Sequence, residues 1–235
     1  MLDEAVSRIV VTGFLGAGKS RIAQRLGGDM PIDDGDGISV PVGGPGTRIV
    51  AVVDGANVEA CLSDPLMGAI IRAQIAAADV IVLSRGDVVD IRPVQRLIEP
   101  LTSQPILDAH RDAIAAEVIA GLPAGTSAAA ASFADQFVEW GYRGPAILTQ
   151  AAAEQLLADR PEGAWRIAGV VRVPDGGMDL QVFGRGRQVT KVDAPEETVL
   201  RAIGPRQTFR EKGMDLAFSE AVMTSAYDQG VIACR

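Results

Sequence analysis

The chain has few of the residues from which redox and transition-metal sites are built. Its 235 residues include two cysteines, Cys61 and Cys234, and one histidine, His110. Cysteines this far apart form neither a disulfide framework nor a paired-cysteine metal motif. A dedicated zinc or nickel site of the histidine and cysteine kind is therefore not expected. A single histidine just before an expected helix also gives no basis for a Ser/His/Asp catalytic set.

Long apolar runs and basic stretches are missing as well. No uninterrupted apolar run is long enough to span a bilayer, and the N-terminus, "MLDEAVSR", is acidic where a secretory signal would be basic. The net charge is −8 and no basic stripe is present, which argues against nucleic acid as a partner. With 48 % hydrophobic and 22 % charged residues, the composition is that of a globular protein. We expect a cytoplasmic protein with no membrane or nucleic-acid partner.

The first half of the chain alternates between strand and helix patterns. β-Branched apolar runs predict strands over 8–12, 48–54 and 78–84, and the last two are continuous enough to be buried parallel strands. Helical spacing predicts helices over 19–26, over 57–78 with a break near Pro65, over 94–101 and over 110–122. This order predicts a doubly wound α/β domain with its ligand at the carboxyl ends of the strands.

The second half has a different pattern. The small, almost uncharged stretch "GLPAGTSAAAAS" (121–132) marks a boundary, so we expect domains over 1–125 and 133–235 with a linker over 126–132. Strands are expected over 137–142, 164–174 and 178–192, with a turn over 174–177. Helices are expected over 149–160, capped by Thr149, and over 195–204. These elements predict a small α+β domain.

One short motif carries explicit chemistry. Gly13, Gly18, Lys19 and Ser20 in "GFLGAGKS" fit the Walker A pattern Gly-x-x-x-x-Gly-Lys-Ser/Thr, between a strand and a helix. Its glycines allow backbone N–H groups to face phosphate oxygens, Lys19 reaches the β- and γ-phosphates, and the Ser20 hydroxyl can bind Mg²⁺. The alternative is a glycine-rich turn that only joins strand to helix. We expect nucleotide contacts from Gly13, Gly16, Ala17, Gly18, Lys19, Ser20 and Arg21.

Several stretches together resemble one family, the CobW-like metallochaperone GTPases, which are relatives of the urease- and hydrogenase-maturation GTPases. The stretches are "VTGFLGAGKS", "VVDGANVEACL" and "QIAAADVIVLSRGDVVD", and more loosely "WRIAGVVRV" and "LQVFGRGR". The resemblance implies a P-loop NTPase domain followed by a small α+β domain. It also implies GTP or GDP with Mg²⁺ as ligand, a client metalloprotein, and a role in metal or cobalamin-type cofactor homeostasis.

The chain also departs from this family. It has no cysteine before Cys61, so the family's Cys-x-Cys-Cys metal motif is missing, and no counterpart of its Walker B segment, Glu-Thr-x-Gly, is found. Only 27 residues separate Ser20 from Arg48, where the missing strands and helix would need about 50. We therefore expect an internal deletion, loss of the γ-phosphate switch and slow hydrolysis, and we assign no catalytic residue.

The base-reading motif of the family, Asn-Lys-x-Asp, is replaced here by Ser84-Arg85-Gly86-Asp87. The Asp87 carboxylate could accept from both donors on the guanine edge, and Arg85 could lie across the base, but Ser84 cannot reproduce the asparagine. The alternative is an ordinary turn at the end of a strand.

Three other polar positions were weighed for a role. Asp54 follows a strand and is either a Mg²⁺ ligand or a structural strand-end aspartate. The "DDGDG" stretch (33–37) lacks the spacing of a calcium loop, so a solvated loop is expected, and "GRGR" (184–187) is expected to be a solvated hairpin.

The resulting hypothesis is a shortened CobW-like protein that binds GTP with Mg²⁺ and hydrolyses it slowly. One alternative is a pseudo-GTPase that serves as a binding or scaffold module without turnover. The other is an ATP-dependent phosphotransferase or regulator, because the base-reading motif is altered.

Overall fold

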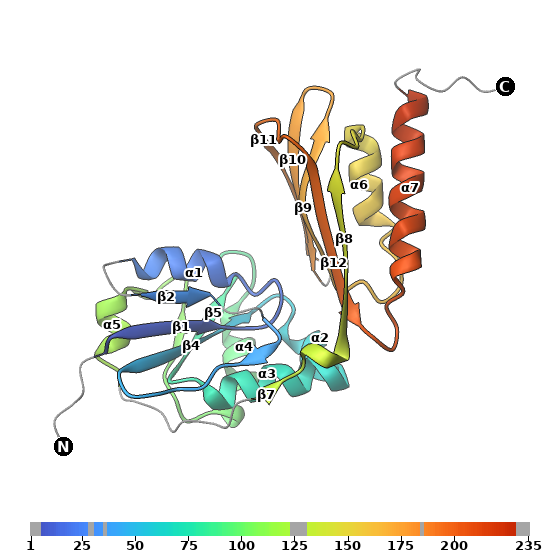
Figure 1. Cartoon of the computed structure of the whole chain (residues 1–235). Helices are drawn as coiled ribbons and strands as arrows, with labels where there is room; N and C mark the ends of the chain where they lie inside the picture. The colour runs from blue at the N-terminus through green and yellow to red at the C-terminus, as the bar shows by residue number, and fades with distance from the viewer. Residues whose placement is uncertain (1–5, 28–30, 35–36, 123–130, 184–185, 229–235) are drawn as a thin grey trace. The chain divides into compact units, whose positions relative to one another are not determined.

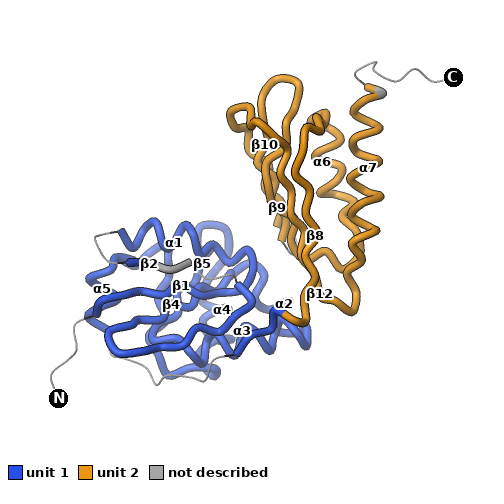
Figure 2. The backbone as a smooth tube through the Cα atoms, viewed as in Figure 1, with its two compact units in different colours: residues 1–134 blue, residues 135–235 orange. Residues whose placement is uncertain are grey.

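The computed structural model describes residues 6–27, 31–34, 37–122, 131–183 and 186–228. The chain divides into two compact units, residues 1–134 and 135–235, which Figure 2 shows in blue and orange. No helix among the described residues is long and apolar enough to cross a membrane.

The first unit is built on a five-stranded parallel sheet (Figure 1). Its strands, in spatial order, are β2 (Ile32–Asp34), β1 (Arg8–Thr12), β4 (Thr47–Asp54), β5 (Val80–Ser84) and β6 (Ile106–Asp108). Its helices are α1 (Lys19–Leu26), α2 (Val58–Ser63), α3 (Pro65–Ala77), α4 (Ile91–Ile98) and α5 (Ala116–Ala120), with a 3-10 turn, η1 (Glu99–Leu101). The α/β fold class and the parallel sheet predicted from the sequence are confirmed.

The chain runs outward from β1 in both directions, first to β2 and then to β4, β5 and β6. Parallel crossovers are right-handed, so helices that follow opposite directions lie on opposite faces. One face packs against α1 and α5, where Ile22 and Ile119 join the core formed with Val50 and Val82. The reversal of direction lies between β1 and β4, and in this fold ligands bind at the carboxyl ends of the strands beside such a point.

One expectation for the helices of the first unit differs from the structure and another is confirmed. Of the helix expected over 110–122, only α5 forms a helix. The residues before it form turns. There the Asp108 carboxylate accepts a hydrogen bond from His110 N, and the Asp108 carbonyl oxygen accepts one from Arg111 N. The helix expected over 57–78 does break near Pro65, since Asp64 caps α3 by accepting from the N–H groups of Leu66 and Met67.

The second unit is a five-stranded antiparallel sheet with two helices on one face (Figure 1). The strands, in spatial order, are β11 (Gly186–Val192), β10 (Gly176–Phe183), β9 (Arg166–Val173), β12 (Thr198–Pro205) and β8 (Phe137–Gly144). The helices are α6 (Gln150–Ala158) and α7 (Glu211–Asp228), with a 3-10 turn, η2 (Ala134–Gln136). Thr149 caps α6 as expected, because its side chain accepts from Ala152 N.

The prediction of a helix over 195–204 is wrong, because most of this segment belongs to β12. Its side chains alternate: Leu200 and Ala202 are buried beneath the helices, and Arg201 between them is exposed. Every second side chain of this segment is buried against the core, and this favours a strand more strongly than Pro195 favours the start of a helix. The strand pattern over 178–192, with a hairpin expected at 184–187, forms the antiparallel hairpin of β10 and β11. Residues 184 and 185 of this stretch lie outside the described residues.

The expected linker over 126–132 falls mostly outside the described residues. Its last two residues, Ala131 and Ser132, form β7 and pair antiparallel with β3 (Ser39–Val40) within the first unit. The end of the first unit is thus held by hydrogen bonds to the segment that follows β2.

Candidate functional site: the P-loop and the strand ends around it

The Walker A loop joins β1 to α1 over residues 13–18. Gly13, Gly16 and Gly18 have φ values of 142°, 77° and 93°, which glycine adopts without strain. At Gly13 a Cβ would lie 2.3 Å from the Val52 carbonyl oxygen, so the loop passes directly over β4. These constraints give the loop its tight curl, as the motif predicts.

The helix that follows places the charged and hydroxyl groups of the motif. Lys19 and Ser20 are the first two residues of α1; Lys19 is buried and Ser20 is exposed, as is Arg21. Gly18 occupies the N-cap position and has no side chain with which to cap the helix. The positive N-terminal end of α1 therefore faces the loop without a side-chain acceptor from the cap, as phosphate binding at such loops requires.

The sequence did not predict β2, a strand within the 27 residues between Ser20 and Arg48. β2 lies beside β1 on the side opposite β4, with Val11 paired to Asp34. The "DDGDG" stretch is therefore not simply a solvated loop: its first two residues end β2, and Gly37 is buried. The sequence signal was the spacing Asp34-x-x-Gly37 after a short apolar start. It was missed because β2 is only three residues long.

Gly37 lies against the P-loop. A Cβ at this position would lie 2.9 Å from Lys19 Nζ and 3.2 Å from the Leu15 backbone nitrogen, and the φ of Gly37 is 90°. The backbone at Gly37 thus comes close to the lysine amine that the motif assigns to the β- and γ-phosphates.

The Ser84 side chain contacts the P-loop. The Ser84 side chain is buried at the end of β5, and its Oγ donates to the carbonyl of Ala17 in the P-loop at 2.8 Å. The Val53 carbonyl lies 3.3 Å from the same oxygen. Ser84 therefore ties β5 to the P-loop, and its one hydroxyl proton is used for this bond rather than for a base.

Asp54 has a structural environment. Its two carboxylate oxygens accept from the Ala56 N–H and from Asn57 Nδ2, both at 2.9 Å, and Arg85 Nε lies 3.9 Å away. The side chain is buried. These contacts favour the strand-end alternative over the Mg²⁺ ligand. The Arg85 guanidinium is paired with Asp54 at 3.9 Å, and its placement across a base stays a prediction.

Two carboxylates lie at the ends of β5 and β6. Asp87 is exposed in the turn after β5. Asp108, which the sequence reading missed, ends β6, and a Cβ at Gly86 would lie 2.5 Å from its Oδ1. Asp108 accepts from His110 N at 2.8 Å and pairs with Arg111 at 3.5 Å. The signal for Asp108 was a short apolar run that ends in aspartate, "PILD".

The loop after β6 is also attached to the C-terminal end of α1. The guanidinium of Arg25, in the last turn of α1, donates to the backbone carbonyl oxygens of Ala109 and Asp112. The helix behind the P-loop and the segment beside Asp108 are therefore joined by one side chain.

The cysteine and carboxylate side chains of the described residues form no cluster suited to a metal ion. Among the described residues, no group of three or more histidine, cysteine, aspartate or glutamate side chains could hold a metal ion. Cys61 is buried on α2, and burial, followed by the charges of Asp54 and Asp64, raises its pKa to about 11. Cys234 lies outside the described residues.

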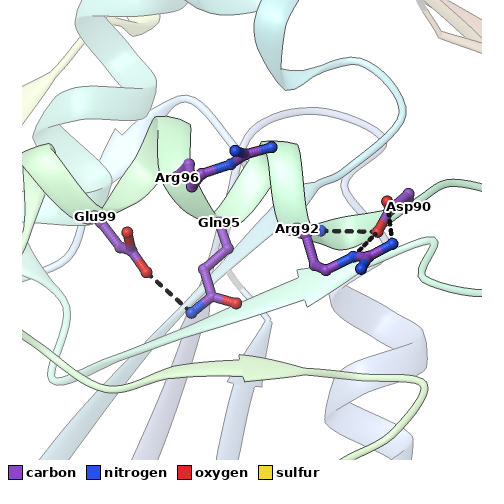
Figure 3. A pocket seen from close by; sticks show the side chains of 5 residues that line it. All are labelled: Asp90, Arg92, Gln95, Arg96 and Glu99. Atoms are coloured by element: carbon purple, nitrogen blue, oxygen red, sulfur yellow. Dashed lines mark hydrogen bonds and ion pairs between the residues drawn. The ribbon is translucent and has the colours of Figure 1, made fainter.

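A separate pocket on α4 has a polar lining, shown in Figure 3. Arg92 donates to Asp90, which lowers the pKa of that carboxyl group, and Gln95 donates to Glu99 at 3.0 Å. The acidic side chains of this pocket are thus already engaged with neighbours on the same helix. We assign no ligand to it.

No protein-family model and no curated protein matches the chain. Two solved structures are similar, both Zn(II)-bound forms of YjiA GTPase. The E. coli protein is 14 % identical, and the match covers 92 % of this chain and 98 % of that one, with a TM-score of 0.33. A triple mutant is 16 % identical, with 74 % of this chain and 60 % of that one covered and a TM-score of 0.33. A TM-score of 0.33 supports no conclusion about function, so any function must be inferred from the residues of this chain.

Proposed function

We propose that the first unit binds a nucleoside triphosphate with Mg²⁺ at the loop of residues 13–20. The observation that carries the proposal is the geometry around Lys19. A loop with three left-handed glycines leads into the uncapped end of α1, and Gly37 from the segment after β2 lies beside the lysine amine. Such an arrangement supplies backbone donors, a helix N-terminus and a cation to one polyphosphate.

For Mg²⁺ we propose the Ser20 hydroxyl at the start of α1, where this residue is exposed. A hydroxyl oxygen suits a cation that keeps several waters and is shared with phosphates. Asp54 is a poorer candidate for a second ligand, since both of its oxygens already accept hydrogen bonds.

The test is a thermal shift with nucleotide. A ligand at a hundred times its dissociation constant stabilises a fold by about 2.7 kcal/mol. Lys19→Ala should remove most of this stabilisation, whereas Lys191→Ala, which removes an exposed lysine of the second unit, should leave it unchanged. An equal shift in wild type and Lys19→Ala would place the nucleotide elsewhere.

We propose guanine as the base, selected by Asp87. An ionised carboxylate matches the N1–H and N2 amino donors of guanine, and a mismatch typically costs about 1–3 kcal/mol, so GTP should bind roughly tenfold or more tightly than ATP. Asp87→Asn should weaken GTP and favour xanthosine triphosphate, with Asp175→Asn, an exposed turn residue, as the matched control. Equal affinity of the wild type for GTP and ATP would refute guanine selection.

One observation favours ATP as the second candidate. The Asp108 carboxylate lies against Gly86, beside the turn that carries Asp87. A carboxylate there accepts from a 6-amino group and repels the 6-oxo group of guanine. If Asp108 faces the base, ATP displaces GTP in the same competition assay, and Asp108→Asn reverses that order.

Turnover is proposed to be slow. Only 27 residues join Ser20 to Arg48, and positioning water and stabilising the transferring phosphoryl group account for nearly all of the rate in this chemistry. The purified protein should turn over well below the common median of about 10 per second. The role in metal or cobalamin homeostasis and the client metalloprotein are proposed on the family resemblance alone. Retention of stoichiometric zinc through dialysis against a mild chelator would contradict the expected absence of high-affinity zinc binding.

A further inference from the structure

β11 forms one edge of the sheet in the second unit (Figure 1). It pairs with β10 over its whole length, from Gly186 beside Phe183 to Val192 beside Gly177. Among the described residues, no strand pairs with its other side. Because alternate backbone N–H and C=O groups of a strand face each of its two neighbours, half of these groups on β11 point away from the sheet.

This edge lacks the features that usually keep edge strands from pairing with other chains. Natural edges are often short, or carry a proline or a bulge. β11 has seven residues and no proline, and its register with β10 runs without a gap, so it contains no bulge. All of its residues except Val189 are exposed. The edge is therefore able to take up a further strand.

The side chains of β11 alternate between the two faces of the sheet. Val189 packs against the core on the face that α6 and α7 cover, so Arg187 and Lys191 lie on that same face. Both cations are exposed, and no carboxylate of the described residues forms an ion pair with either. Gln188 and Thr190 lie on the opposite face, where Gln188 Nε2 donates to Thr190 Oγ1 at 3.3 Å. The edge thus presents two cations with an apolar residue midway between them.

These cations determine which strand can pair with β11. In an antiparallel pair of two copies centred on Val189, Arg187 of one copy would face Lys191 of the other, and like charges directly opposite are destabilising. Registers that avoid this contact leave fewer residues of β11 paired. A strand with carboxylates opposite Arg187 and Lys191 forms two favourable cross-strand pairs instead. Asp193, exposed just after β11, repels a further carboxylate at that end.

We propose that β11 is the docking edge for an extended acidic segment of a partner protein, which adds a further antiparallel strand to this antiparallel sheet. The segment carries two carboxylates four residues apart, with an apolar side chain midway between them. Main-chain hydrogen bonds along the free edge supply affinity, and the side chains opposite Arg187, Val189 and Lys191 supply selectivity. The proposal concerns the second unit and does not depend on nucleotide binding by the first.

The first test is binding of the synthetic peptide TETVTET to the intact chain, followed by amide hydrogen exchange. With the peptide, we expect slower exchange at residues 186–192 and no change at residues 137–144 of β8, the opposite edge of the sheet. Unchanged exchange at residues 186–192 would overturn the proposal.

Two modified peptides test whether the main chain makes the contact. One carries N-methyl groups on the glutamates and the valine, and the other carries them on the threonines. Only alternate N–H groups of a strand face one neighbour, so one of the two versions must lose binding. If both bind as well as TETVTET, no strand is added and the proposal is wrong.

The last test exchanges the charges. Arg187→Glu combined with Lys191→Glu should weaken binding of TETVTET by about tenfold or more and should allow binding of TKTVTKT, which the wild type should reject. Lys212→Glu, at an exposed position of α7, is the matched control and should bind TETVTET like the wild type. Equal affinity of the wild type for the two peptides would refute the acidic partner. Self-association of the wild type that sedimentation detects and TETVTET does not reverse would make a second copy the occupant, and would refute it as well.

Discussion

Removal of the Ser84 hydroxyl tests the link between β5 and the P-loop most directly. Ser84→Ala deletes a donor that lies 2.8 Å from the Ala17 carbonyl oxygen, at a position that is 8 % exposed. Ala17 itself is 2 % exposed, so water has little access to replace the lost bond. A buried acceptor left without a partner costs about 1–3 kcal/mol, and we expect the first unit to lose that much stability.

The choice of probe matters for this measurement. Both tryptophans, Trp140 and Trp165, belong to the second unit, so fluorescence would follow the wrong part of the chain. Amide exchange of β4 and β5 reports on the first unit. Nucleotide affinity should fall as well. Each 1.4 kcal/mol of binding free energy that is lost with the P-loop geometry lowers the affinity tenfold.

A matched control is available on α2. Ser63 Oγ donates to the Glu59 carbonyl at 3.0 Å, but this pair is exposed. Ser63→Ala should therefore change stability by no more than about 0.5 kcal/mol. If Ser84→Ala is as mild as this control, the buried hydroxyl does not support the P-loop, and the structural role that we assign to Ser84 is refuted.

Three further predictions concern positions near the site. Gly37→Ala should destabilise the first unit by about 1–2 kcal/mol because of its φ of 90°, and Gly44→Ala, with nothing within 4 Å, should be nearly neutral in the same urea unfolding assay. Asp54→Ala should lower stability by about 1–3 kcal/mol yet leave the Mg²⁺ dependence of nucleotide binding unchanged; a changed dependence would restore its metal role. In a Cys234→Ser background, the stability difference between Cys61 and Cys61→Ala should shrink as pH rises from 9 towards 11, since the unfolded thiol ionises near its ordinary pKa of 9.0 and the folded one only near 11. A difference that does not vary with pH would contradict the raised pKa.

Elements with strong local patterns could be predicted from the sequence, and elements fixed by distant partners could not. β4 and β5 are continuous apolar runs, and α1 follows a motif that requires a helix. β2 and β6 are three residues each and owe their existence to pairing with β1 and β5. α7 was not predicted, although Met214, Phe218 and Ala221 recur at helical spacing on its buried side.

The residues of the site likewise fall into those that a local pattern predicts and those that depend on distant partners. The Walker A residues carry their chemistry in a contiguous motif, so their placement followed from the sequence. The contacts of Ser84 and Asp108 join residues 22 to 67 positions apart, and a single sequence contains no record of such pairs. Asp54 shows the converse: in the sequence a strand-end carboxylate resembles a metal ligand, and only the structure shows the hydrogen bonds that its oxygens already accept.

The close approach of Gly13 to the Val52 carbonyl has a consequence for how relatives of this chain are compared. A Cβ at Gly13 would lie 2.3 Å from that oxygen, so the fold itself requires glycine there, with or without a nucleotide. A descendant that had lost its ligand would still retain Gly13, and the glycine's persistence would say nothing about activity. Ser20, exposed on the surface, is under no comparable packing constraint. Among divergent copies of this chain, drift at Ser20 while Gly13 stays fixed would mark the lineages in which the fold outlived its nucleotide.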